Sequence, residues 1–211
     1  TLERFKEGQA PITGRVIFGS SLNGALAGSI AKILANTQAQ VFMDAAQSAS
    51  AALTQAHISA SAFTAEQTYK VAIFDASGIQ SADDLKQVYT FFHPIARSIE
   101  KSGRVVVLGL PPEQCQSIAQ AAAQRALEGF VKSVAKEFKR GITAQLIYVA
   151  EYAAENLEST LRFFASPRSA YVSGQVVRGD MFYANPSLKK AQLRVPQLIQ
   201  LGQEVSYDAA A

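Results

Sequence analysis

With 211 residues, 48% of them hydrophobic, and a formal net charge of +3, the chain has the size and composition of one generous globular domain. Its basic residues are scattered, with short clusters at 136–140 and 189–194, and neither cluster is a basic stripe with interleaved aromatic side chains, which argues against nucleic-acid binding. No apolar run approaches the roughly 18–20 residues that cross a bilayer, so we expect no membrane span.

The cysteine and histidine content excludes two kinds of site. Cys115 is the single cysteine, so an internal disulfide is impossible, and we expect a reducing, cytoplasmic location. His57 and His93 are far apart in the sequence, and together with one cysteine they leave no candidate set of metal ligands. We therefore predict no metal site.

Short apolar runs alternate with segments of helical periodicity along the chain. Pro111 and Pro112 open the longest helical segment, and Gly141 ends it. Pro94 lies inside the preceding helical segment, which it kinks or breaks. The stretch 45–68, rich in Ala, Ser, Thr and Gln, stays unassigned. In chain order we expect a strand at 15–19, a helix at 25–37, strands at 40–44 and 69–78, a helix at 82–101, a strand at 103–109, a helix at 111–140, a strand at 142–149, a helix at 155–166 and a strand at 170–179.

The strands are continuous apolar runs, which is typical of strands buried on both faces of a parallel sheet. The sequence therefore predicts an α/β fold with a doubly wound parallel sheet of about five or six strands, Rossmann-like or flavodoxin-like. Residues 1–13 form a lead-in segment, 14–184 form the domain, and 185–211 are a tail or linker.

Two polar stretches follow strands and suggest a ligand site. The loop at 19–24, GSSLNG, either binds a phosphate through Gly19, Ser20 and Ser21 or forms a plain turn with a serine cap. Asp75 either orients a ligand at the edge of the sheet or caps its own turn together with Ser77. Elsewhere, His93 is a general base or a surface residue, and Cys115 is a reactive or an inert thiol.

Five stretches, in order, resemble the short-chain dehydrogenase/reductase family: GRVIFG, IFDASGI, SGRVVVLG, RALEGFVKSVAKEFKRGIT and FFASPRSAYVSGQVV. The lead-in TLERFKEGQAPITG, with RALEGF and SAYVSGQV, is similar to the degenerate N-terminal half of high-molecular-weight 3-oxoacyl-acyl-carrier-protein reductases. The resemblance covers about residues 1–182. It implies a place in fatty-acid metabolism, and NAD(P)H is the cofactor of the family.

The same resemblance implies that catalysis is lost. In the family a Tyr and a Lys four residues apart donate a proton and hold the cofactor ribose, and aligning ALEGF places Ala121 and Arg125 there. In the family a serine polarises the substrate carbonyl, and Leu110 stands at its position here. The family also has an asparagine on the preceding helix, which has no counterpart near Phe91. We predict no catalytic residue.

The cofactor loop and the acyl-binding lid are also altered. Gly19 remains, but Asn23 and Ala25 stand at the next two glycine positions, and the lid segment is shortened to about fifteen residues. Any nucleotide would be held by Gly19, Ser20, Ser21 and Asp75, and we expect no cofactor in this chain.

In the family, the long helix often pairs with its twin, so the resemblance implies a homodimer or docking to a C-terminal reductase domain. We expect Leu127, Val131 and Val134 at that interface, and Ala126, Phe130, Val134 and Phe138 on the packing face. Three functions stay open: a non-catalytic domain of a 3-oxoacyl-ACP/CoA reductase that supports assembly, a nucleotide- or flavin-binding module, and a 3-oxoacyl reductase with a rearranged active site.

Overall fold

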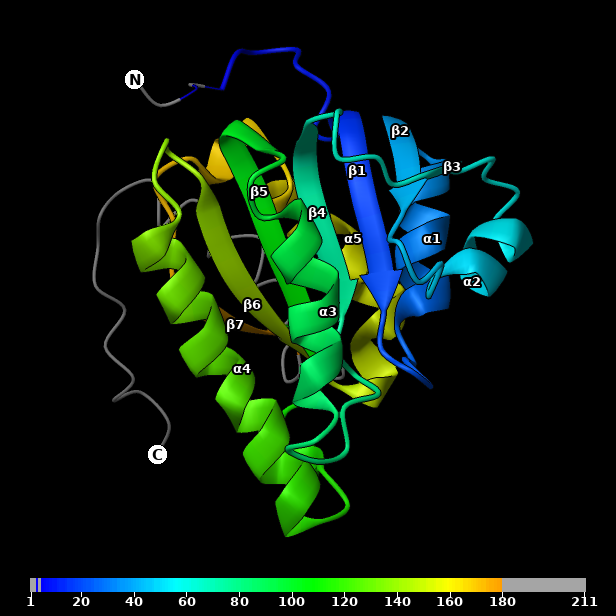
Figure 1. The fold of residues 1–211 in the computed structure, drawn as a ribbon, viewed down its shortest axis with the longest axis vertical. Helices are drawn as coiled ribbons and strands as arrows, with labels where there is room; N and C mark the ends of the chain where they lie inside the picture. The colour runs from blue at the N-terminus through cyan, green and yellow to red at the C-terminus, as the bar shows by residue number, and fades with distance from the viewer. Residues whose placement is uncertain (1–2, 4, 180–211) are drawn as a thin grey trace, which may run out of the picture.

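The computed structural model describes residues 3 and 5–179, and its centre is a seven-stranded parallel sheet with helices on both faces (Figure 1). The strand order is β3-β2-β1-β4-β5-β6-β7. The strands are β1 (Thr13–Ser20), β2 (Gln38–Met43), β3 (Ser61–Ala62), β4 (Tyr69–Asp75), β5 (Ile99–Gly109), β6 (Thr143–Val149) and β7 (Gln175–Gly179). The predicted α/β class and parallel, Rossmann-like sheet are confirmed.

Five α-helices and three short 3₁₀ helices connect these strands in the described part of the chain. The α-helices are α1 (Ala27–Ala35), α2 (Ser50–Gln55), α3 (Leu85–Ile95), α4 (Ile118–Glu137) and α5 (Leu157–Phe164). The 3₁₀ helices are η1 (Pro112–Gln114), η2 (Glu151–Asn156) and η3 (Pro167–Ser169). No helix among the described residues is long and apolar enough to cross a membrane.

The sheet has two hydrophobic layers because side chains alternate between its faces. In β5, Val106 and Leu108 pack with α1 and α5, whereas Val105 and Val107 pack with α3 and α4. Figure 1 shows α3 and α4 side by side in front of the sheet and α5 behind it. The central strands are covered on both sides, which is why their sequences are continuous apolar runs.

Two predicted helix boundaries were wrong. Residues 82–101 were expected to be one helix, but α3 ends at Ile95, one residue after Pro94, and β5 already begins at Ile99. Proline removes a backbone donor and clashes with the preceding turn, so it limits the helix there. The helix expected at 111–140 begins only at Ile118, where the Ser117 side chain caps it by accepting from the backbone N–H of Gln120.

The sheet has seven strands rather than the predicted five or six. The stretch 45–68, left unassigned, contains α2 and β3, and β3 is a two-residue edge strand with exposed side chains. So short a strand with no buried residue leaves no hydrophobic pattern in the sequence. The expected tail at 185–211 lies outside the described residues.

Candidate functional site

The carboxyl ends of β1 and β4 meet where the strand order reverses, because β1 is flanked by β2 on one side and β4 on the other. In open parallel sheets ligands bind in the crevice outside this switch point. The structure brings together here all four residues predicted to hold a nucleotide: Gly19, Ser20, Ser21 and Asp75.

Asp75 is fully buried at the centre of this crevice. Its Oδ1 accepts from the backbone N–H of Ser77 at 3.0 Å, which is the local turn that the sequence suggested. Its Oδ2 accepts from the backbone N–H of Leu26 at 3.0 Å and from the Ser20 hydroxyl at 3.3 Å. The carboxylate therefore also binds the start of α1, where a nucleotide phosphate would accept hydrogen bonds in a dinucleotide-binding fold.

Most backbone amides between Ser20 and Leu26 are bound to acceptors of the protein itself. Ser77 Oγ accepts from the N–H of Ala25 at 2.7 Å, and Gln87 Oε1 accepts from that of Leu22 at 2.7 Å. The remaining contacts join Ser20 N–H to Ser48 Oγ, Ser21 N–H to the Asp75 carbonyl, and Gly24 N–H to the Ser21 carbonyl. A phosphate would have to displace these acceptors.

Three glycines allow the loops to pack this closely. A Cβ on Gly24 would collide with Ser20 Oγ and the Asp75 carboxylate, and one on Gly78 would collide with the Leu22 carbonyl. At Gly19 a Cβ would collide with the ring of Phe91. The retained Gly19 thus makes room for an aromatic side chain of α3.

Burial raises the pKa of the Asp75 carboxyl above its ordinary value, because a charged carboxylate is disfavoured away from water. Hydrogen bonds from Ser77, Leu26 and Ser20 oppose this shift. In its charged form Asp75 would repel a second anion at the start of α1.

The inward face of α4 carries two glutamines four residues apart, Gln120 and Gln124, both buried. Ala121 and Arg125 were expected at the positions of the family Tyr and Lys, but Arg125 is exposed and Ala121 is half-buried. Since a proton donor must face the carboxyl edge of the sheet, Gln120 and Gln124 occupy the relevant face. The residues of α4 that face the sheet are thus two neutral amides rather than Ala121 and Arg125.

Gln124 joins the loops that follow β4 and β5. Its Oε1 accepts from the backbone N–H of Leu110 at 2.9 Å, and its Nε2 donates to the carbonyls of Ala76 at 2.9 Å and Ile79 at 3.0 Å. A Cβ on Gly109 would lie only 2.6 Å from its Oε1. The amide uses both its atoms structurally, so the space beside β5 is closed.

Tyr148 of β6 is the buried tyrosine nearest to this amide, but its hydroxyl is also engaged. It donates to the Gln124 carbonyl at 3.0 Å and lies 3.2 Å from Glu128 Oε1. Burial, followed by the nearby Glu128 carboxylate, raises the pKa of Tyr148 far above its ordinary value. A phenol with so high a pKa is a poor proton donor at neutral pH.

The residues expected to form a partner interface lie in the core instead. Leu127 and Val131 have no exposed surface and Val134 is 6% exposed, all packed with the sheet and α3. The prediction chose the buried face of α4. Ala126, expected to pack inward, is exposed, whereas Phe130 and Phe138 do pack at the margin of the core.

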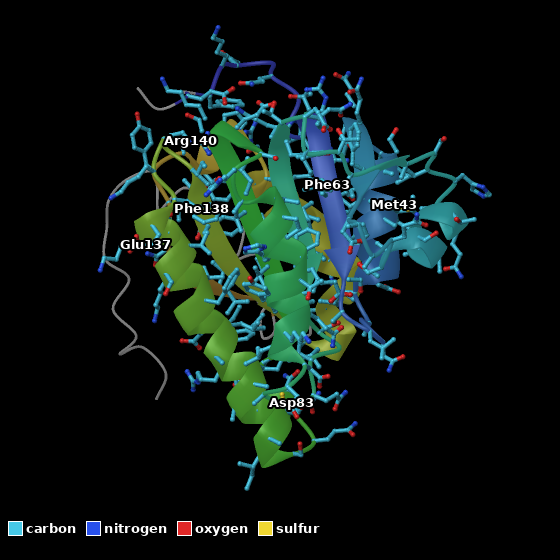
Figure 2. The ribbon with its side chains drawn as sticks, in the orientation of Figure 1. Met43, Phe63, Asp83, Glu137, Phe138 and Arg140 are labelled. Atoms are coloured by element: carbon cyan, nitrogen blue, oxygen red, sulfur yellow. The ribbon has the colours of Figure 1, made fainter. Side chains whose placement is uncertain are left out.

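A second polar group, which the sequence analysis missed, lies at the end of β2. Asp44 is 6% exposed, and its Oδ1 accepts from the backbone N–H of Ser48 at 2.8 Å and its hydroxyl at 2.9 Å. It borders a shallow hollow of about 270 Å³ whose other walls include Phe74, Phe91 and Asp83. Figure 2 places Asp83 at the carboxyl-edge end of the molecule. The signal for Asp44 was its position immediately after an apolar strand.

The two other candidate residues, His93 and Cys115, make contacts within the protein. His93 is exposed and stacks on Tyr89 with ring centroids 4.7 Å apart. The Cys115 thiol lies 3.5 Å from the Pro111 carbonyl, and burial raises its pKa. Among residues 3 and 5–179, no group of three or more His, Cys, Asp or Glu side chains is placed to hold a metal ion.

The lid is short in the structure as well. Only η2 separates Ala150, at the end of β6, from α5. The connection where the resemblance places a lid is thus a six-residue 3₁₀ helix.

No family model and no curated protein matches the chain. Solved structures do match it. A short-chain dehydrogenase/reductase from Serratia marcescens has 18% identity and a TM-score of 0.61, with 80% of this chain and 97% of that one covered. A dehydrogenase/reductase from Sinorhizobium meliloti has 16% identity and a TM-score of 0.58, covering 79% and 94%.

A structure of BdcA in complex with NADPH has 16% identity and a TM-score of 0.59, and the match covers 80% of this chain and 95% of that chain. At such identities the likeness establishes the fold. The chain has the α/β Rossmann-like fold of short-chain dehydrogenase/reductases.

Proposed function

We propose that this chain is a non-catalytic Rossmann-like domain of a 3-oxoacyl-ACP/CoA reductase, the N-terminal half of a two-domain protein, and that it supports assembly. The order of sequence motifs and the fold of the solved neighbours support the family. The reduction itself would then be performed by residues outside this chain.

One observation carries this proposal: most backbone amides of the loop that would hold a dinucleotide are bound to the protein's own acceptors. Asp75 and Ser77 accept from Leu26 and Ala25, just before α1, and Gln87 accepts from Leu22. An active enzyme keeps these amides for the cofactor phosphates. Here they stabilise the contact between the β1 and β4 loops.

The chemistry of α4 supports the same conclusion. Carbonyl reduction needs a proton donor beside the accepting oxygen, and an amide such as Gln120 or Gln124 has no acidic proton at neutral pH. Gln124 is moreover held by three hydrogen bonds to backbone groups. Both the acid and the space for a substrate carbonyl are lacking on this face.

For the assembly role we propose the outward face of α4. Ala122, Ala126, Gly129 and Ser133 lie on it at spacings of three and four residues and are exposed. A Cβ added to Gly129 would meet nothing within 4 Å. Small side chains allow a second helix to approach closely, so this face suits a twin helix or a reductase domain.

The proposal is tested by binding and turnover with the purified chain. Calorimetric titration with NADH, NADPH and FMN is expected to give no saturable heat, and mixing with NADPH and acetoacetyl-CoA is expected to give no loss of absorbance at the nicotinamide band. An intact 3-oxoacyl reductase in the same assay serves as the positive control. Turnover by the chain itself would refute the non-catalytic assignment.

A second candidate function, a nucleoside-binding module, is favoured by Asp44. In dinucleotide-binding folds an acidic residue at the end of the second strand accepts from the ribose hydroxyls. Asp44 stands at this place, beside an aromatic-walled hollow. Its ligand would be a nucleoside without a pyrophosphate, since the phosphate loop is closed.

Titration with adenosine, compared with NADH, separates the two candidates. Saturable binding of adenosine that Asp44→Asn weakens tenfold or more would establish the second function, and Asp83→Asn on the same rim serves as the matched control. If adenosine gives no binding heat, the nucleoside-binding function is refuted and only the assembly role stands.

A further inference from the structure

At the opposite, amino-terminal edge of the sheet, β5 contains a buried arginine that the proposed function does not use. Arg104 is 1% exposed, and its side chain lies on the face covered by α5. A guanidinium remains charged in a protein, and an isolated charge away from water is strongly destabilising. Arg104 therefore needs a compensating group.

The hydrogen-bond partners of Arg104 are all neutral. Its Nε donates to the Ser166 carbonyl at 3.0 Å, and its Nη1 donates to the carbonyls of Ser102 at 2.8 Å and Gly103 at 3.1 Å. Within the described residues its Nη2 has no acceptor, although that atom is buried. Nη2 therefore carries two N–H bonds that are buried away from surface water.

A second unpartnered atom lies next to it. Thr143 of β6 is the register partner of Arg104, so both side chains project from adjacent strands on the same face. The Thr143 Oγ1 is buried and also has no partner among the described residues. Two donors that project from neighbouring strands on one face of the sheet are thus without an acceptor among the described residues.

A carboxylate compensates this charge only in part. Glu3 is the acidic group that acts on Arg104, but its side chain is one-third exposed and forms an ion pair with Lys70. The segment that carries it runs over the amino edge of the sheet (Figure 1) and is held by Phe5, whose ring lies 4.4 Å from the Arg168 guanidinium. Glu3 is thus shared between Lys70 and Arg104.

We propose that Arg104 and Thr143 form a buried binding site for a small monovalent anion of the halide type. The anion accepts from Nη2 of Arg104 and from the Thr143 hydroxyl, and its charge offsets that of the guanidinium. A water molecule would accept the same hydrogen bonds but would leave the charge uncompensated.

The test is thermal unfolding of the whole chain in sodium chloride and in sodium gluconate at equal ionic strength, because gluconate is too large for such a site. We expect the melting temperature to be higher in chloride by about 3 °C, the shift that ligand linkage gives for a protein of this size at several times Kd. Crystals soaked in sodium bromide are expected to show an anomalous peak within hydrogen-bond distance of Arg104 Nη2.

Thr143→Val keeps the shape of the side chain and removes the hydroxyl, so it is expected to abolish most of the chloride dependence. Thr143→Ser retains the donor and is expected to keep it. Equal melting temperatures in the two salts would overturn the proposal. So would an unchanged chloride dependence in Thr143→Val, or ordered water without bromide signal at Nη2.

Discussion

The crevice at the carboxyl edge and the outward face of α4 belong to the same layer of the fold but differ in how their polar and small residues are used. In the crevice, Asp75, Ser77 and Gln124 bind backbone groups of neighbouring loops. On the outward face, Ala126 and Gly129 are exposed, and a Cβ on Gly129 would meet nothing within 4 Å. In the crevice, the polar side chains thus stabilise the contacts between loops, whereas the outward face of α4 presents small, exposed side chains, the surface that the proposed function assigns to a partner.

The largest effect is expected from breaking the crevice at Gln124. Gln124→Ala leaves the Leu110 N–H and the Ile79 carbonyl without their amide partner, and the Ala76 carbonyl keeps only its hydrogen bond from the Ile79 N–H. Each unsatisfied group costs about 1–3 kcal/mol, so we expect a loss of about 3 kcal/mol in the free energy of unfolding, after partial relaxation. Urea denaturation measures it.

Gln114→Ala is the matched control, because Gln114 is exposed in η1. It should change the free energy of unfolding by less than about 0.5 kcal/mol. A similarly small loss in Gln124→Ala would show that the amide does not hold the loops together.

A second change addresses the internal carboxylate. Asp75→Asn keeps the size of the side chain, but the NH₂ group of the amide would face N–H and O–H donors that now donate to the carboxylate. We therefore expect the free energy of unfolding to fall by about 2 kcal/mol near neutral pH. The wild-type chain should also show a pH dependence that the variant lacks, because burial raises the pKa of Asp75 in the folded state.

The sign of this pH dependence follows from linkage. The folded protein binds the Asp75 proton more tightly than the unfolded chain, whose carboxyl has the ordinary pKa of 3.8. The resulting stabilisation is fully present below that value and is lost as pH rises through the higher pKa of the folded state. Denaturation at several pH values, with Asp83→Asn as control, should give a wild-type minus variant difference that falls with rising pH. A difference that rises with pH would contradict the direction of the shift.

The outward face of α4 is tested with Ala126→Arg. A long charged side chain there prevents the close approach of a twin helix, so we expect self-association to weaken tenfold or more, about 1.4 kcal/mol, with the folding unchanged. Sedimentation velocity over a range of concentrations measures this.

Ala35→Arg provides the control, since Ala35 is exposed at the end of α1 on the other side of the sheet. It should leave the association unchanged. If both variants associate as strongly as the wild type, the outward face of α4 is not the association surface.

The smallest effect is expected at Cys115, which lies between the two regions, just before α4. Burial raises the pKa of its thiol, so less thiolate is present at neutral pH than in an exposed cysteine. Alkylation by iodoacetamide should be a few-fold slower than that of free cysteine at pH 7.5, and it should accelerate with pH. A faster reaction than free cysteine would point to an activated thiol.

Much of the fold followed from local patterns. The six longer strands and the parallel sheet were predicted because central strands such as β4 and β6 are unbroken apolar runs. The two-residue β3 was missed, and the starts of β5 and α4 were misplaced. Local periodicity cannot show that Ile99 belongs to a strand rather than to the preceding helix. Its pairing with Tyr69 of β4 is a contact between residues far apart in the sequence.

For the candidate site, the sequence by itself determined which chemical groups are present. It placed Gly19, Ser20, Ser21 and Asp75 at strand ends and showed that no tyrosine is followed by a lysine four residues later. These facts depend only on residue identity and spacing.

Only the tertiary structure decided what those groups do. It turned Leu127 and Val131 inward, showed that Gln120 and Gln124 rather than Ala121 and Arg125 face the sheet, and brought Asp75 to the start of α1. The physical reason is that hydrogen bonding and burial join residues far apart in the chain. Whether an amide is free for a phosphate or already bound to a carboxylate 49 residues away depends on that packing.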